Sequence, residues 1–265
     1  MQRSFTDQLN RTVSIVYPPK RIVSLVPSQT ELLFELGLSQ EIAGITKFCV
    51  HPAAQFKVKT KVGGTKKLNI ELIRSLQPDL IIGNREENTP EDIALLEQEF
   101  PVWISDVHNL EEAMHTITQI GELVDRQPEA AYLNYLINAG FTDLQTLALQ
   151  LGIDKKVAYV IWNDPVMLAG KDTFINDILT KIGLQNVVKD NRYPEISMQE
   201  LAALQPELIF LSSEPYPFRE KHLEEFKIAF PEVKIMLVDG EIFSWYGSRL
   251  VKAVQYLFQL QPQLN

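Results

Sequence analysis

The sequence is poor in the residues from which disulfides and metal sites are built. Its 265 residues include one cysteine, Cys49, so no disulfide can form within the chain. The four histidines lie far apart, and neither a His-x-x-x-His nor a Cys-x-x-Cys pair occurs. A structural zinc site is therefore not expected. We predict that the chain has no metal site and no cofactor of its own.

The sequence also lacks an excess of basic residues. Lysine and arginine total 25 against 34 aspartates and glutamates, which gives a net charge of −9 at pH 7. A surface that binds nucleic acid needs an excess of Lys and Arg to contact the phosphates. We therefore expect no nucleic-acid partner.

The motifs of several common enzyme classes are absent. The sequence contains no Gly-x-Gly-x-x-Gly, no Gly-x-x-x-x-Gly-Lys-Ser/Thr and no Gly-x-Ser-x-Gly. Its carboxylates do not pair in a pattern that suggests acid–base catalysis. We expect a protein that is not an enzyme and has no catalytic residues.

Signals for export and for membrane insertion are missing as well. The stretch from Met1 to Arg11 has neither the apolar region nor the small-residue cleavage site of a signal peptide. No apolar run approaches the roughly 18 residues that a membrane-spanning helix needs. On these residues the protein is either cytoplasmic or a processed form of an exported protein, and the sequence leaves both open.

The residues that are present predict a soluble α/β protein. Apolar residues make up 45% and charged residues 22% of a chain long enough for two domains. A β-hairpin is expected within residues 4–17. After it, apolar strands at 22–26, 42–45, 80–82 and 102–104 alternate with helical segments. Near-continuous apolar strands of this kind indicate a parallel sheet covered on both faces.

The first strand and the helix after it form the most informative segment. The strand at 22–26 stops at a proline, and Ser28 with Glu31 has the Ser-x-x-Glu spacing of a capping box. The helix that follows is expected to end at Gly37 and to bury Leu32, Leu33 and Leu36. A helix N-terminus at the carboxyl edge of a sheet is where α/β proteins bind ligands. We predict ligand contacts at Pro27 and Ser28, although a purely structural cap would have the same pattern.

The middle of the chain interrupts the alternation with helix. A helix is expected over 110–124, and a second one from Pro128 to Leu151 with no strand between them. We predict an N-terminal α/β lobe (1–125), a connecting backbone helix (126–152) and a C-terminal α/β lobe (153–265). The alternative is an ordinary crossover helix that is merely long.

The two halves share sequence. Residues 76–82, Leu-Gln-Pro-Asp-Leu-Ile-Ile, match residues 204–210, Leu-Gln-Pro-Glu-Leu-Ile-Phe. Residues 36–38, Leu-Gly-Leu, match residues 182–184, Ile-Gly-Leu. An internal duplication predicts two similar lobes that face each other across a cleft.

Aromatic and polar residues follow the predicted strands in both halves. Aromatic faces with a few polar groups suit a bulky, flat or apolar ligand. Each aromatic taken singly is explained as well by burial in a core, but as a set they favour a ligand cleft. The predicted ligand-binding residues, besides Pro27 and Ser28, are Phe48, His51, Asn84, Arg85, Trp162, Tyr193, Trp245 and Tyr246.

Two glutamates occupy the first turns of corresponding helices. Glu71 follows the expected cap Asn69 by two residues, and Glu200 follows the cap Ser197 by three. Negative charge is favoured at a helix N-terminus, and Ser197 with Glu200 is itself a capping box. The alternative to these structural roles is that both acids dock onto a two-fold basic partner.

Taken together, these motifs resemble a known family. The segments Thr6–Arg11, 19–31, 69–71 with 76–82, 168–171, and 197–200 with 204–209 are similar to the helical-backbone (class III) solute-binding proteins of ABC importers. The resemblance covers nearly the whole chain. Within that family the sequence is most similar to the cobalamin-binding branch, followed by ferric siderophore and haem receptors.

The resemblance implies a fold and a set of partners. It implies two Rossmann-like α/β lobes joined by a single long rigid backbone helix, with the ligand cleft between the lobes. It also implies a periplasmic or cell-envelope location, a monomer that binds a corrinoid or similar metal chelate, and delivery to an ABC permease dimer. Glu71 and Glu200 would then be the acids that pair with permease arginines.

The sequence departs from the cobalamin branch where the first lobe would place tryptophans. Thr65 and Asn84 stand at these positions, and the loop around Tyr193 lacks a tryptophan. Ferric siderophore and haem therefore stay open as ligands. A cytoplasmic enzyme or metallochaperone that handles a corrinoid or tetrapyrrole on the same scaffold is the alternative from another functional class.

Overall fold

The computed structural model describes residues 1–264 and separates into two compact units. Unit 1 consists of Met1–Val107, Glu111–Leu136 and Tyr246–Arg249. Unit 2 consists of His108–Leu110, Ile137–Trp245 and the residues from Leu250 onward. The short segment Tyr246–Arg249 therefore belongs to unit 1, although the residues on both sides of it belong to unit 2.

Unit 1 begins with the predicted hairpin. β1 (Gln2–Thr6) and β2 (Thr12–Val16) pair antiparallel, which confirms it. The turn contains Asn10, whose φ of 61° is tolerated by asparagine. The Asp7 carboxylate fixes the turn because it accepts hydrogen bonds from the backbone N–H groups of Leu9 (3.0 Å) and Arg11 (2.8 Å).

The core of unit 1 is a five-stranded sheet in the order β5-β4-β3-β8-β9, and all its strands are parallel. Ile22 in the central strand pairs with Ile42 on one side and Leu80 on the other. The parallel sheet predicted for the first half is confirmed. Its strands are β3 (Ile22–Ser24), β4 (Ile42–Ile45), β5 (Thr60–Lys61), β8 (Leu80–Asn84) and β9 (Val102–Ser105).

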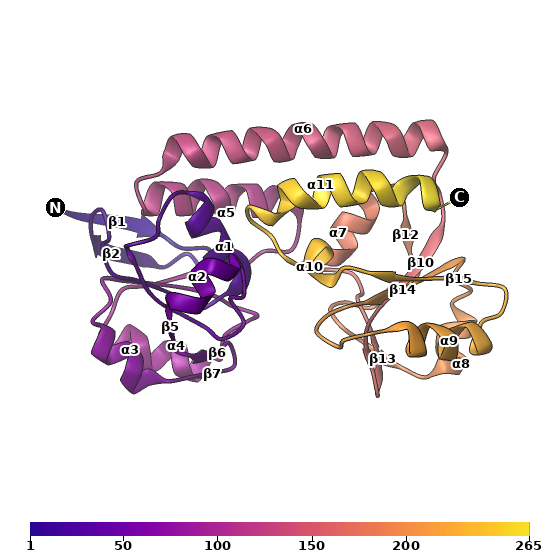
Figure 1. Ribbon diagram of the computed structural model, residues 1–265, viewed down its shortest axis with the longest axis horizontal. Helices are drawn as coiled ribbons and strands as arrows, with labels where there is room; N and C mark the ends of the chain where they lie inside the picture. The colour runs from indigo at the N-terminus through magenta and orange to yellow at the C-terminus, as the bar shows by residue number, and fades with distance from the viewer. Residues whose placement is uncertain (265) are drawn as a thin grey trace. The chain divides into compact units, whose positions relative to one another are not determined.

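Helices cover this sheet. α3 (Ile70–Leu76) and α4 (Pro90–Glu97) contact each other, and Ile73 and Ile93 pack with the sheet residue Ile81 in one buried cluster. Figure 1 shows α5 on the other side of the unit from α3 and α4. The other elements of unit 1 are α1 (Pro27–Glu35), α2 (Ala53–Val58), β6 (Gly63–Gly64), β7 (Lys67–Leu68), α5 (Leu110–Leu123) and the first part of α6 (Gln127–Leu151).

The start of α1 differs from the expected capping box. The helix begins at Pro27, its N-cap is Val26, and no side chain caps it. Proline suits the first helical position because its missing N–H would have no partner there. Glu31 lies two residues beyond the third helical position, where a capping glutamate would stand, so the capping prediction is wrong. The inward-facing leucines are confirmed, as is the end of the helix at Gly37, whose φ is +84°.

Unit 2 contains a mixed sheet. β10, β14 and β15 run parallel, but β11 pairs antiparallel with both β10 and the edge strand β13, in the order β13-β11-β10-β14-β15. The sheet of this half is therefore mixed, because the chain turns back directly from β10 into β11. The strands are β10 (Lys156–Asn163), β11 (Val166–Leu168), β12 (Gln185–Asn186), β13 (Glu195–Ile196), β14 (Leu208–Ser212) and β15 (Lys234–Val238).

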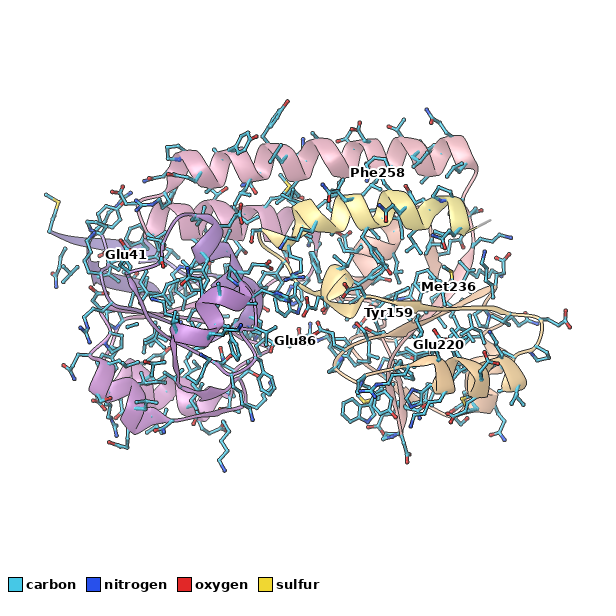
Figure 2. The ribbon with its side chains drawn as sticks, in the orientation of Figure 1. Glu41, Glu86, Tyr159, Glu220, Met236 and Phe258 are labelled. Carbon is cyan, nitrogen blue, oxygen red and sulfur yellow. The ribbon has the colours of Figure 1, made fainter. Side chains whose placement is uncertain are left out.

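One face of this sheet packs on helices α8 and α9, through Ile209 and Leu211 against Leu201 and Phe226. The other face carries Tyr159, which is fully buried and is labelled in Figure 2. The helical elements of unit 2 are α7 (Phe174–Lys181), α8 (Met198–Ala203), α9 (Glu220–Ala229), α10 (Gly240–Ser244), α11 (Arg249–Leu260), which starts in unit 1, and the 3₁₀ turn η1 (Gln261–Gln263).

The predicted long helix is present as α6, a continuous helix of 25 residues from Gln127 to Leu151. It passes close to neighbouring helices through small residues. Gly121 of α5 lies against Ala130, and a Cβ added at Gly140 would come within 2.6 Å of Val254 in α11. Its role as a connector between lobes stays a prediction.

The backbone supports the predicted internal duplication. Gln77 and Gln205, which occupy matching positions after α3 and α8, have φ values of +47° and +49°. Gly37 and Gly183, at the ends of α1 and α7, have φ values of +84° and +88°. Helix ends that match in both sequence and left-handed backbone conformation favour a common origin of the two segments.

Candidate functional site

The predicted ligand residues of unit 1 gather at one edge of its sheet. Pro27 and Ser28 follow β3, and Phe48 and His51 follow β4. Asn84 is the last residue of β8, and Arg85 follows it. Because β3, β4 and β8 are adjacent and parallel, their carboxyl ends lie at the same edge. Glu86, labelled in Figure 2, marks the loop after β8.

Phe48 is the exposed aromatic of this edge. Half of its surface is accessible. Its ring lies over Gly64, where an added Cβ would come within 3.1 Å of Phe48 Cε2. The Lys47 ammonium lies 5.0 Å from the ring centroid, a cation–π contact. The glycine at position 64 therefore leaves room for the exposed ring beside the backbone.

Asn84 organises the loop that follows β8. Its Oδ1 accepts hydrogen bonds from the backbone N–H groups of Glu86 (2.9 Å) and Glu87 (3.0 Å), and its Nδ2 donates to the carbonyl (3.1 Å) and hydroxyl (3.0 Å) of Ser105. Its side chain is buried, whereas Arg85 is exposed and pairs with Asp106 at 2.8 Å. Asn84 thus shapes this edge, and a direct contact with ligand stays a prediction.

Tyr246 enters unit 1 from the distant end of the chain. Its side chain is 8% exposed and lies near Ser28 and Ser105. Burial raises the pKa of the Tyr246 hydroxyl, and the Glu87 carboxylate acts in the same direction. The phenol is therefore a neutral donor or acceptor beside the N-terminus of α1.

A buried ion pair holds this segment in place. Arg249 Nε and Nη2 donate to the two carboxylate oxygens of Glu31 at 2.8 and 3.0 Å, and both side chains are less than a tenth exposed. Gly247, with φ of +105°, lets the chain pass α1, where an added Cβ would lie 3.2 Å from the Ser28 carbonyl. Sequence patterns could not find this pair, because its members are 218 residues apart.

In unit 2 the predicted residues again follow parallel strands. Trp162 closes β10, Tyr193 follows β12, and Trp245 follows β15 and α10. Trp162 is 37% exposed, and its indole N–H donates to the carbonyl of Asp164 at 3.0 Å. Tyr193 is half-buried, with the Arg192 guanidinium 6.0 Å from its ring centroid, and Trp245 is buried.

Sequence reasoning missed two residues of this edge, Glu214 and Tyr216. Glu214 accepts a hydrogen bond from the indole N–H of Trp245 at 2.8 Å. Tyr216 packs edge-on against Trp162, with ring centroids 5.5 Å apart. Both lie in the loop after β14, so the rule that picked out the residues after the other strands would have found them.

The two predicted docking acids differ in their surroundings. Glu71 is exposed at the start of α3 and pairs with Arg74 at 2.5 Å. Glu200 closes the predicted capping box, which is confirmed, and hydrogen bonds from Ser197 lower the pKa of its carboxyl. Aligning the matching residues Gln77 and Gln205 places Gln199, and not Glu200, at the position of Glu71.

Cavities in unit 1 lie beside Arg11 and Glu97. Two, of about 310 and 190 Å³, flank the ion pair between Arg11 and Glu97, and Asn84 and Arg85 line the smaller one. Among residues 1–264 there is no group of three or more His, Cys, Asp or Glu side chains placed to hold a metal ion. No helix within the same residues has the length and apolar character needed to cross a membrane.

Comparison with known sequences gives a family match. Residues 22–232 match the family described as periplasmic binding protein. The chain is 27% identical to the uncharacterized ABC transporter substrate-binding lipoprotein YvrC of Bacillus subtilis, covering 95% of this chain and 82% of that protein. It is 24% identical to the vitamin B12-binding protein of Vibrio cholerae, covering 74% and 71% of the two chains.

A solved structure with the same fold is the periplasmic heme-binding protein RhuT from Roseiflexus sp. RS-1 in its apo form. It superimposes with a TM-score of 0.81 at 19% identity, covering 93% of this chain and 99% of that one. At this identity the likeness concerns the fold. The predicted α/β fold of the solute-binding type is confirmed.

Proposed function

Because the chain belongs to the periplasmic binding protein family, we propose that it is the substrate-binding component of an ABC importer that captures a metal chelate. The B. subtilis relative is an ABC transporter substrate-binding lipoprotein, which supports the transport role and a place in the cell envelope. The relatives named above are binding proteins, and they give no support to the cytoplasmic alternative or to an enzyme.

The observation that carries the proposal is Trp162. A tryptophan with more than a third of its surface accessible, at the carboxyl end of a central strand, is costly to expose unless something covers it. Phe48 is exposed in the same way at the corresponding edge of unit 1. In each unit an exposed ring after a parallel strand offers a large, flat ligand an apolar surface.

A corrinoid is the ligand we favour. The V. cholerae relative is a vitamin B12-binding protein, and its similarity extends over most of this chain. The RhuT structure shows that the same fold serves a heme-binding protein. His51, half-buried at the edge of unit 1, offers an imidazole that would suit a metal at the centre of either chelate.

Titration of the purified protein separates these ligands. We expect tryptophan fluorescence to be quenched to saturation, at one ligand per chain, by cyanocobalamin, with haem and a ferric siderophore as comparators. Saturation by haem or the siderophore alone would replace the corrinoid by that ligand. If none of the three bound, the proposed function would be wrong.

Replacing Trp162 by alanine tests whether its exposed ring contacts the ligand. We expect cyanocobalamin to bind roughly tenfold more weakly, because an aromatic contact in a binding face is worth about 1–2 kcal/mol. Leu149→Ala is the matched control, since Leu149 is 83% exposed on α6 and should leave the affinity unchanged. Isothermal titration calorimetry of both variants gives the two affinities. Equal affinities for Trp162→Ala and wild type would remove Trp162 from the site.

Glu71 tests the docking role of the acids. We expect Glu71→Ala to reduce cellular uptake of the chelate roughly tenfold by loss of an interfacial charge, while ligand affinity in solution is unchanged. Glu200→Ala should mainly loosen the first turn of α8, because its carboxylate caps that helix. Unchanged uptake by Glu71→Ala would exclude this residue from docking.

A further inference from the structure

The loop of residues 213–219, between β14 and α9, touches both tryptophans at the carboxyl edge of unit 2. Glu214 holds the Trp245 indole through its N–H, and the same Oε1 accepts a second hydrogen bond from Ser244 Oγ at 2.9 Å. Tyr216 supports Trp162 from the side, through an edge contact at an interplanar angle of 68°. One short loop therefore contacts two aromatic side chains from different elements, Trp162 of β10 and Trp245 at the end of α10.

The loop is itself fixed at its start. The buried Tyr159 hydroxyl donates to Ser212 Oγ at 3.1 Å, and Ser212 Oγ donates to the Glu214 carbonyl at 2.6 Å. Burial raises the pKa of Tyr159, so its hydroxyl keeps the proton that it donates. Glu214 packs closely against Gly240, because a Cβ added at Gly240 would come within 2.6 Å of Glu214 Cγ. Glu214 is thus anchored to the core of the sheet.

The far part of the loop is held by His222, which is 4% exposed in α9. The Arg219 N–H donates to His222 Nδ1 at 3.0 Å, and His222 Nε2 lies 3.1 Å from the Tyr216 hydroxyl. Because Nδ1 accepts, the proton of the neutral ring lies on Nε2 and is donated to Tyr216. Phe218 packs against Tyr216 and Phe226, with ring centroids 4.7 and 6.1 Å apart respectively.

We propose that this loop is a positioning element for ligand binding, with Glu214 and Tyr216 orienting Trp245 and Trp162 before the ligand arrives. A partly exposed tryptophan without a lateral support would have to be ordered on binding, and that ordering would weaken affinity. Glu214 and Tyr216 are positioning residues, since they act through the tryptophans. The inference deepens the proposed function and rests on it for its effect on affinity.

The test measures tryptophan mobility without ligand and affinity with it. The chain has three tryptophans, and Trp103 is buried in unit 1. In a Trp245→Phe background we expect Tyr216→Leu to increase acrylamide quenching of Trp162, while Tyr216→Phe, which keeps the ring contact, changes it less. In a Trp162→Phe background we expect Glu214→Ala to increase quenching and mobility of Trp245, and Glu214→Gln, which keeps an acceptor, to restore the wild-type value.

The corresponding single variants, Tyr216→Leu and Glu214→Ala, should bind cyanocobalamin about two- to tenfold more weakly than wild type. Glu220→Ala is the control, because Glu220 lies exposed at the start of α9 (Figure 2) and should change neither readout. Quenching that stays at the wild-type value in Tyr216→Leu and Glu214→Ala would overturn the positioning role. Increased quenching with unchanged affinity would overturn its importance for binding.

Failure of the proposed function would give a different result. If the wild-type protein bound none of cyanocobalamin, haem and the ferric siderophore, the transport proposal would fall. The quenching data would still decide whether the loop orients the tryptophans.

Discussion

Replacing Arg249 with methionine is expected to lower the free energy of unfolding by about 3–5 kcal/mol, the cost of leaving one member of a buried ion pair uncompensated. The substitution removes both hydrogen bonds to Glu31 and leaves a carboxylate that is 5% exposed without its cation. Urea unfolding followed by circular dichroism measures the loss.

Two further variants identify the cause of that loss. Glu35→Gln changes an exposed glutamate on the same helix and should alter stability by less than about 0.5 kcal/mol. The double variant Glu31→Gln with Arg249→Met should recover much of the loss, because no buried charge remains. A loss in Arg249→Met no larger than in Glu35→Gln would show that the pair does not hold Tyr246–Arg249 against α1.

Replacing Phe243 with alanine is expected to cost about 3–5 kcal/mol, the usual range for removing a buried aromatic ring. Phe243 is completely buried, and its ring lies 5.2 Å from that of Tyr159 and 6.0 Å from that of Phe210. These neighbours belong to β10 and β14, so the cavity would open where α10 joins the sheet. Urea unfolding measures the decrease in the free energy of unfolding.

An exposed residue of the same unit provides the control. Ile228 in α9 is 83% exposed, and Ile228→Ala should stay within about 0.5 kcal/mol of wild type. Because α10 carries Trp245, we also expect Phe243→Ala to weaken cyanocobalamin binding more than Ile228→Ala does. Similar stabilities for the two variants would contradict the view that the three rings form the support of α10.

Local patterns in the sequence were sufficient to predict most of the elements. The cap at Asn69, the capping box at Ser197, the helix end at Gly37 and the long helix starting near Pro128 all depend on residues within one or two turns of each other. Such signals depend on neighbouring residues alone, and each of the predicted caps and helix ends is present in the structure. The shared segments 76–82 and 204–210 also have the same backbone at their glutamines.

Contacts between distant segments were beyond the reach of those patterns. Glu31 matched a local capping rule, but a proline at the first helical position starts the helix earlier, and the carboxylate pairs with Arg249. A ligand contact of Asn84 stays a prediction, and the sequence did not reveal that its amide orders the next loop through Glu86, Glu87 and Ser105. Only the fold reveals which partner a buried polar group has.

The candidate ligand residues could be predicted from the sequence only in part. That aromatic residues follow strands could be read from the sequence, and the parallel sheets bring those of each unit to one edge. Which of these residues remain exposed could not be predicted from the sequence. In the structure Phe48 and Trp162 are accessible, whereas Trp245 and Tyr246 are buried. Burial depends on neighbours such as Glu214 and Arg249 that no spacing rule connects to these rings.

The central claim is that a metal chelate covers the exposed rings that follow parallel strands, Phe48 in unit 1 and Trp162 in unit 2. Hydroxyl-radical footprinting with mass spectrometry, with and without saturating cyanocobalamin, tests it most directly. We predict that the ligand reduces oxidation of Phe48, Trp162 and Tyr193, and leaves exposed residues elsewhere, such as Tyr132, Tyr135 and Ile228, unchanged. Protection confined to those other residues, or no protection at Phe48 and Trp162 in a saturated complex, would contradict the account.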